Sequence, residues 1–311
     1  MKVTDLHADV ICKLLENPGM RWGNDARDDL FDVTPQRLSE GGISLQVFAL
    51  YLPDKVARNT DTLFRAAELF WSEILTSPRM KLIRRPGDIA DAEREGRIGA
   101  ILSLEGADGL QGQLWALRLM HRLGLRLLGP TWNNANWACD GAMEPRGGGL
   151  TRAGKELVAE CGKLGILIDV SHLSERGFWD VSQQSAKPIF ASHSNVRAYK
   201  EHPRNLRDDQ LKELIRAGGL IGVTFVPWFL TEREQATTDD VLRHVEYVCA
   251  FGGESNVAFG SDFDGIDRHP VGLRHPGQYP ALIEALLKRY PESLVRGFAG
   301  ENANRFFAKN L

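Results

Sequence analysis

The sequence predicts a single domain over residues 1–311 with a (β/α)8 fold, a barrel of the TIM type. Two observations predict it: eight apolar runs of strand length recur along the chain, and helical patterns separate most of them. The runs are almost continuously apolar, which is typical of parallel strands covered on both faces. Eight such strands alternating with helices favour a closed barrel. One domain is expected because the sequence contains no internal repeat, low-complexity tract or flexible linker.

The predicted strands are short runs rich in branched and aromatic apolar residues. They cover residues 3–9, 43–50, 98–105, 124–130, 165–171, 188–193, 218–225 and 257–262.

Helices are predicted where apolar residues recur at helical spacing. Residues 150–164 show this pattern, as does a helix expected to be capped by Thr238 or Asp239 and to end at Gly252. Residues 51–97 are too long for a single crossover, so at least two helices are expected there. The long polar loops that follow strands, at 132–149 and 263–280, are expected to contact substrate.

Composition restricts the class of protein. The net charge of -3 gives no basis for binding nucleic acid or an anionic membrane surface. No apolar run is long enough to cross a membrane, and residues after Met1 do not have the pattern of a signal peptide. The four cysteines form no CxxC pair. The expectation is a cytoplasmic protein with reduced cysteines and no membrane or nucleic-acid partner.

Five metal-ligating side chains fall at the ends of four predicted strands. They are His7, Asp9, Glu105, His172 and His193. Because the carboxyl ends of barrel strands meet at one face, where active sites are built, these side chains are expected to converge on a divalent metal. Nitrogen and oxygen donors without thiolate favour zinc, manganese or iron over a structural zinc held by cysteine. The pattern therefore predicts a metal-dependent hydrolase.

Each ligand also has a simpler explanation. His7 and Asp9 share a strand face, so they could be a hydrogen-bonded pair without a metal. Glu105 could bridge two metals or pair with a cation at the barrel mouth, and the sequence leaves both open. His172 and His193 could be structural, and each has a neighbouring serine that could hydrogen-bond to its ring. The recurrence at four strand ends favours metal.

Asp262 closes the last predicted strand and is the candidate general base. A carboxylate beside a metal site can accept the proton of an attacking water. Asp264 is the second candidate, although Gly265 after it indicates a turn, in which Asp264 would make an Asx-type bond.

Arg204 is the candidate for binding a substrate carboxylate, because a guanidinium can form two parallel hydrogen bonds to it. Asn205 or Asp208 is expected to cap the helix that follows. The remaining histidines are predicted to be surface or capping residues. They are His121, His202, His244, His269 and His275.

Taken in order, the motifs DLHADV, LSLEGA, DVSHLSE, ASHSNVRA, HPRNLRDD and GSDFDG, with GENANRFF near the C-terminus, resemble the membrane (renal) dipeptidase family and its bacterial cytosolic members. The resemblance implies a barrel with two zinc ions and a homodimer. One ion would take His7, Asp9 and Glu105, and the other Glu105, His172 and His193. It also implies that Asp262 is the catalytic acid and base and that Arg204 binds the C-terminal carboxylate of a dipeptide.

Trp132 departs from the family pattern. Many members have a histidine here that contacts the substrate carbonyl, whereas this chain reads PTWNNANW. Tryptophan donates only through its indole N–H and cannot carry a proton charge. Trp132 and Asn133 are expected to contact substrate, and oxyanion stabilisation would come from the metals, from Asn133 or from another group.

The predicted reaction is hydrolysis of dipeptides with a free C-terminal carboxylate. The resemblance implies L-L substrates and also L-D substrates, since the family tolerates D-residues at the C-terminal position. One alternative is another amidohydrolase-type reaction, on an N-acyl amino acid, β-lactam or lactone. His7, Asp9 and Glu105 argue against it, because those enzymes often use an H-x-H pair and a carbamylated lysine. A second alternative is a non-catalytic metal-bound barrel, which only Trp132 favours.

Overall fold

The computed structural model describes residues 1–23 and 30–311. Its sheet is parallel throughout and hydrogen-bonds in the order β6-β5-β4-β2-β1-β8-β7. These strands are β1 (Val3–Asp5), β2 (Ile43–Tyr51), β4 (Ile98–Glu105), β5 (Leu125–Gly129), β6 (Leu167–Ile168), β7 (Ile221–Val223) and β8 (Val257–Phe259).

The barrel closes through the segment between β6 and β7. Phe190 forms a parallel bridge with Asp169, just past β6, and Ala191 forms one with Ile221 of β7. The predicted strand 188–193 is therefore present as isolated bridges and not as a continuous ladder. The reason is local: the N–H of Ser192 donates to the side chain of Asp169 at 3.0 Å. With this closure the predicted (β/α)8 barrel is confirmed.

One strand was not predicted. β3 (Met80–Leu82) pairs in parallel with the first residues of β4, Ile98 to Ala100, and stands off the main path of the sheet. Three residues are too few to give a recognisable alternation. The same segment holds α3 (Thr60–Leu69), which continues into a π-helical turn, and α4 (Pro86–Arg94), so the expected two helices are confirmed.

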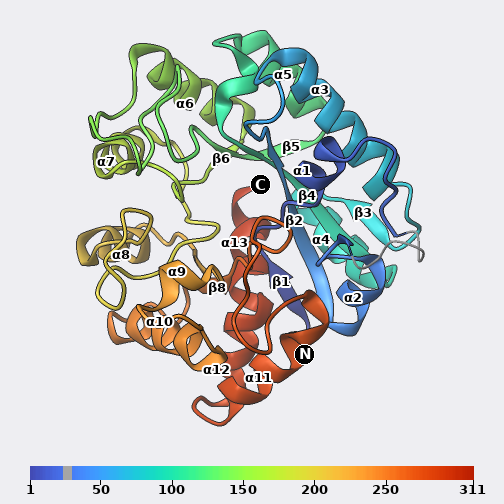
Figure 1. Cartoon of the computed structure of the whole chain (residues 1–311), viewed down its shortest axis with the longest axis vertical. Helices are drawn as coiled ribbons and strands as arrows, with labels where there is room; N and C mark the ends of the chain where they lie inside the picture. Colours follow the sequence, from blue (N-terminus) through green and yellow to red (C-terminus); the bar gives the residue numbers. More distant parts are fainter. Residues whose placement is uncertain (24–29) are drawn as a thin grey trace.

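Helices surround the strands as the chain passes around the molecule (Figure 1). The others are α1 (Val10–Glu16), α2 (Pro35–Glu40), α5 (Leu114–Arg122), α6 (Arg152–Leu164), α7 (Glu175–Gln184), α8 (Asp208–Arg216), α9 (Pro227–Leu230), α10 (Thr238–Ala250), α11 (Tyr279–Leu287), α12 (Glu292–Arg296) and α13 (Asn302–Asn310). In residues 1–23 and 30–311, none of the helices combines the length and the apolar character needed to cross a membrane.

Two predicted helix caps were wrong. Helix α10 is capped by Thr237, one residue earlier than expected, and the Thr237 N–H donates to Asp240 Oδ2 at 2.8 Å. Helix α8 is preceded by Arg207 and not by Asn205. The side-chain amide of Asn205 instead donates to the carbonyl of Phe229 at 2.8 Å. Local sequence patterns cannot predict a contact between residues this far apart in the chain.

The barrel interior is filled by apolar side chains that strands all around the barrel contribute. They include Leu6, Leu45, Val47, Ile101, Leu127, Leu167, Phe190, Leu220 and Ala258. Phe306 and Phe307 of α13 pack onto this inner cluster, with the ring of Phe306 5.9 Å from that of Phe190. Because the interior is packed, any binding site must lie at an end of the barrel.

His244 was predicted to be a surface or capping residue, and that prediction was wrong. The side chain lies inside the protein on α10, with 0% of the residue exposed. Its Nδ1 accepts the N–H of Val196 at 3.1 Å and its Nε2 lies 3.0 Å from the carbonyl oxygen of Leu230. One accepting and one donating nitrogen require a neutral ring. Burial, together with the charge of Arg243, lowers the pKa of His244 to about 4.

We expect His244 to make the protein sensitive to acid between pH 6.5 and 4. The unfolded chain takes up a proton near pH 6.5 and the folded chain only near the lowered pKa, so stability falls as the pH drops through this window. The full contribution is about 3 kcal/mol. His244→Gln should flatten this part of the pH profile of unfolding free energy. Equal slopes in wild type and His244→Gln would contradict the prediction.

Candidate metal centre

Four segments bring the predicted ligands to one end of the barrel. His7 and Asp9 lie just past β1, on either side of Ala8, whose carbonyl accepts the N–H of Ala49 at 3.0 Å. This pairing continues the strand alternation beyond β1 and keeps His7 and Asp9 on one side. Glu105 is the last residue of β4. His172 follows β6 and His193 follows the 190–191 bridges, as the sequence predicted.

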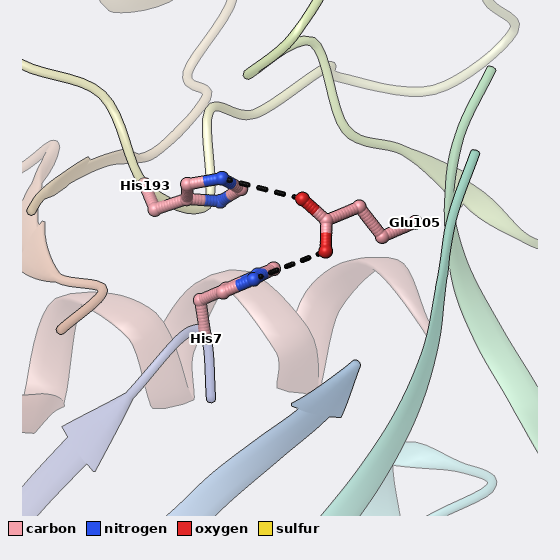
Figure 2. A group of neighbouring side chains, drawn as sticks. All are labelled: His7, Glu105 and His193. Atoms are coloured by element: carbon pink, nitrogen blue, oxygen red, sulfur yellow. Dashed lines mark ion pairs between the residues drawn. The ribbon is translucent and has the colours of Figure 1, made fainter. Parts of the chain in front are cut away.

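The two carboxylate oxygens of Glu105 face different histidines (Figure 2). Oε2 lies 3.4 Å from His7 Nε2, whereas Oε1 lies 2.7 Å from His172 Nε2 and 3.6 Å from His193 Nε2. Asp9 Oδ2 adds a second carboxylate oxygen at 3.3 Å from His7 Nε2. The other four predicted ligands therefore gather around Glu105. His7 lies on one side of its carboxylate, and His172 and His193 lie on the other.

Several polar atoms of this cluster lack the hydrogen bonds that buried polar atoms normally make. Both ring nitrogens of His7 and Oδ1 of Asp9 are buried and have no hydrogen-bond partner among the described residues. The Nε2 atoms of His172 and His193 lie only 2.7 Å apart. Imidazole nitrogens and carboxylate oxygens gathered this closely are the donor set that a bound cation would hold together. These residues therefore fit a divalent metal, which takes such nitrogen and oxygen donors.

Space is kept open beside the cluster by a glycine. A Cβ added to Gly265 would lie 2.3 Å from Asp9 Oδ2 and 2.6 Å from Asp262 Oδ1. Any larger residue would fill the space between these two carboxylates. From the sequence, Gly265 was expected only to mark a turn.

Charge in the cluster is unbalanced in favour of carboxylates. Burial disfavours the protonated ring of His7, but Glu105 and Asp9 outweigh it and hold its pKa well above the usual range. Burial lowers the pKa of His172 to about 3, and burial with neighbouring positive charge lowers the pKa of His193 well below its usual value. His172 and His193 are therefore neutral, the form that binds metals.

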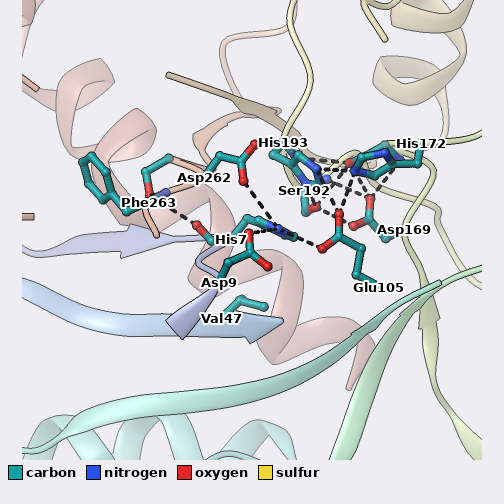
Figure 3. A network of polar contacts seen from close by, with 12 residues as sticks. His7, Asp9, Val47, Glu105, Asp169, His172, Ser192, His193, Asp262 and Phe263 are labelled. Carbon is teal, nitrogen blue, oxygen red and sulfur yellow. Dashed lines mark hydrogen bonds and ion pairs between the residues drawn. The ribbon is translucent and has the colours of Figure 1, made fainter. Parts of the chain in front are cut away.

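Asp262 lies beside His7 and Asp9 (Figure 3), with its Oδ1 3.9 Å from His7 Nε2. The prediction that it closes the last strand was wrong, because β8 ends at Phe259 and Asp262 sits in the following turn with a left-handed backbone, φ 67°. Aspartate tolerates this conformation better than most residues. Burial and the nearby carboxylates raise the pKa of Asp262 to about 8.

Asp264 was the second candidate for the base, but its oxygens are already engaged. Oδ1 accepts from Lys13 Nζ and from the N–H of Asp32, both at 2.7 Å, and Oδ2 accepts from the N–H of Val33 at 3.0 Å. Asp264 therefore holds the segment at residues 32–33 against the loop after β8. This leaves Asp262 as the carboxylate with oxygens turned toward the ligands.

Arg204 is buried, with 3% of the residue exposed, and lines a cavity that Asp9, Glu105 and His172 also line. Its Nη2 donates to the carbonyl of His193 at 3.2 Å, while Nε and Nη1 have no partner among the described residues. The ring of Phe229 lies 5.5 Å from its guanidinium carbon. Burial lowers the pKa of Arg204 to about 10, which still leaves it protonated at neutral pH. A buried cation with free N–H donors is suited to bind an anion.

Trp132 and Asn133 also line the cavity, which has a volume of about 330 Å³. The Trp132 ring lies 5.0 Å from that of Tyr51 and 5.9 Å from that of His172. Asn133 Oδ1 lies 2.9 Å from His172 Nδ1, so its carbonyl oxygen is occupied in orienting this predicted ligand. From the sequence, Asn133 was expected to contact substrate or stabilise an oxyanion, and not to contact His172.

Several residues around the cavity were missed from the sequence. Asp169 and Asp5 are buried carboxylates next to the ligand segments, and the rule that singled out Glu105, a charged residue inside an apolar run, could have found both. Cys12 and Lys13 of α1 and Trp228 of α9, which were missed too, line the cavity itself. These three carry no local signal, because they reach the site only through folding.

Comparison with known proteins places the chain in a family. The family model described as membrane dipeptidase (peptidase family M19) matches residues 1–310. A metallo peptidase from Rhodobacter sphaeroides, whose structure holds a phosphinate mimic of the dipeptide L-Ala-D-Ala, is 31% identical with a TM-score of 0.91, covering 100% of this chain and 99% of that one.

Two curated relatives also match. Dipeptidase tcpJ of Claviceps purpurea is 32% identical over 254 residues, which are 81% of this chain and 57% of that protein. An uncharacterised Klebsiella pneumoniae protein encoded in the pqqA 5′ region is 35% identical over 227 residues, 70% of this chain and 83% of that one. With the whole-length match to the family model, the chain belongs to the membrane dipeptidase family, peptidase family M19, and is a metal-dependent dipeptidase.

Proposed function

We propose that this dipeptidase works with two divalent metal ions, most simply zinc, that share Glu105. The observation that carries the proposal is the division of the Glu105 carboxylate, with Oε2 toward His7 and Oε1 toward His172 and His193. One position would take His7, Asp9 and Glu105. The other would take Glu105, His172 and His193. When bound, such ions lower the pKa of water toward neutrality and polarise a carbonyl group.

Asp262 and Arg204 supply the remaining chemistry. A carboxylate oxygen of Asp262 accepts the proton of the attacking water and returns it to the leaving amine. Ionised Asp262 is required for this step, and cations bound among these carboxylates would favour its ionised form over the protonated one. Arg204 pairs with the C-terminal carboxylate of the substrate through the N–H groups that lack partners in the protein.

The substrate proposed is a dipeptide with a free C-terminal carboxylate. A cavity of about 330 Å³ suits a molecule of this size, and the Rhodobacter sphaeroides relative binds a mimic of L-Ala-D-Ala. We therefore extend the proposal to both L-L and L-D dipeptides, with Trp132 and Asn133 as contacts. The single domain, the cytoplasmic location and the homodimer remain predictions from the sequence.

Metal removal tests the proposal. The purified protein is dialysed against a chelator, its metal content is measured, and hydrolysis of L-Ala-L-Ala and L-Ala-D-Ala is followed before and after zinc is restored. Turnover should vanish with the metal and return as two equivalents rebind. Full turnover by metal-free protein would overturn the proposal. Hydrolysis of N-acetylalanine with no cleavage of either dipeptide would instead support the alternative amidohydrolase reaction.

A further inference from the structure

His193 is oriented through a buried serine and a buried carboxylate (Figure 3). His193 Nδ1 lies 2.7 Å from Ser192 Oγ, and Ser192 Oγ donates to Asp169 Oδ2. A carboxylate only accepts, so the single hydroxyl hydrogen of Ser192 is used on Asp169. Ser192 Oγ must then accept a hydrogen from His193 Nδ1. This leaves the lone pair of His193 on Nε2, the nitrogen that faces Glu105.

Asp169 is itself held firmly. Its Oδ1 accepts from the N–H and the hydroxyl of Ser171, at 3.0 and 2.7 Å, and from the N–H of Ser192 at 3.0 Å. Ser171 Oγ in turn accepts the backbone N–H of His193 at 3.1 Å. The backbone and the ring of His193 are thus both oriented from one carboxylate, which is 5% exposed.

The histidine on the other side of Glu105 has no such support. Neither ring nitrogen of His7 has a hydrogen-bond partner among the described residues. On the Glu105 Oε1 side, by contrast, both rings are supported, because His172 Nδ1 lies 2.9 Å from Asn133 Oδ1. Partners of this kind fix the tautomer and direction of a ligating imidazole and raise its basicity.

We propose that Asp169, acting through Ser192, is a positioning residue that sets the metal affinity of the position formed by Glu105, His172 and His193, and not that of the position at His7. The inference rests on the two-metal site proposed above. Loss of a partner behind a ligating histidine typically weakens metal binding about 10–100-fold. The effect should therefore fall on one of two metal equivalents.

Cobalt titration of the metal-free protein tests the proposal. Binding is followed by the visible absorption of Co²⁺ and by metal analysis, so the readout does not depend on turnover. Ser192→Ala should weaken one equivalent about 10–100-fold and leave the other nearly unchanged. Asp169→Asn should do the same, and Ser192→Ala keeps the test usable if that variant does not fold.

Ser194→Ala is the matched control. Ser194 is the other neighbour of His193, is 1% exposed, and its Oγ has no hydrogen-bond partner among the described residues. Ser194→Ala removes a buried hydroxyl group, as Ser192→Ala does, but leaves the Asp169 contacts intact. Both metal equivalents should therefore bind as in wild type. Equal titrations of Ser192→Ala and Ser194→Ala would overturn the proposal.

A double-mutant cycle identifies the position affected. Ser192→Ala should add nothing to His193→Asn, because the ligand that it orients is already gone. Added to His7→Asn, it should weaken the remaining equivalent by the full factor. The opposite pattern, with additivity to His193→Asn, overturns the proposal. Failure of the proposed function is separate: a protein that shows this cycle but cleaves no dipeptide would refute the function and leave the role of Asp169 standing.

Discussion

Asp262→Asn is expected to lower kcat for a dipeptide by about 10²–10⁴-fold, the usual contribution of a general base. The amide keeps the size of the side chain but cannot accept the proton of the attacking water. Because the proton transfer that is lost is part of the catalytic step and not of substrate binding, KM should change little. The measurement is steady-state hydrolysis of L-Ala-D-Ala by zinc-loaded wild type and variant.

Metal analysis of the same variant separates a base from a ligand. Asp262 can share a cation with His7 and Asp9, since their ligand atoms lie within 4.8 Å of one another. A base-only role predicts that Asp262→Asn keeps both metal equivalents. Asp267→Asn is the control, because Asp267 is an exposed carboxylate in the same loop. A variant that keeps near-wild-type kcat would remove Asp262 from the mechanism, and one that loses metal would make it a ligand.

Arg204→Ala is expected to lower kcat/KM for a free dipeptide by tens to hundreds of times. Losing a charged hydrogen bond costs roughly 1.5–3 kcal/mol, and this energy appears directly in kcat/KM. The protein itself uses little of the guanidinium, since Nε and Nη1 are buried without a partner among the described residues. A substrate carboxylate is the group that would satisfy them.

An amidated dipeptide makes this prediction specific. It carries no terminal charge, so Arg204→Ala should affect its hydrolysis far less. Arg204→Lys keeps the charge but cannot form two parallel hydrogen bonds to a carboxylate. Its kcat/KM for the free dipeptide should therefore lie between those of wild type and Arg204→Ala. Arg207→Ala is the control, because Arg207 lies in the same segment with about half of its side chain exposed. Equal losses on free and amidated substrates would mean that Arg204 supports the metal ligands and not substrate binding.

The ligand candidates could be predicted from the sequence because the free-energy cost of burying a charged or polar side chain can be recognised from its immediate sequence neighbours. Glu105 ends an apolar run, and a charged or polar side chain is kept there only when a partner compensates its burial. The same reasoning applies to His172 and His193. Parallel strands then bring their carboxyl ends together whatever the intervening helices are. Strand order and the end of the barrel that holds the site follow from the same pattern.

Contacts between residues far apart in the sequence could not be predicted this way. Asn133 was expected to face substrate, yet its oxygen meets His172, a residue 39 positions away. His244 was assigned to the surface because its helix gave no sign of what covers it, and Val196 and Leu230 bury it. Both contacts depend on which loops pack together, and local hydrophobic periodicity does not predict that packing.

By itself the sequence determined the barrel, the family motifs and the set of ligand-type residues at the strand ends, because hydrophobic periodicity and the cost of burying charge act over a few residues. Only the tertiary structure decided which oxygen of Glu105 faces which histidine, that Asp264 is engaged with Lys13 and the segment at residue 32, and that Asp169 stands behind His193. Those outcomes are set by short contacts between distant segments, such as the 2.7 Å between Glu105 Oε1 and His172 Nε2. Such distances are fixed only when the barrel closes and its loops pack, since they depend on every strand register at once.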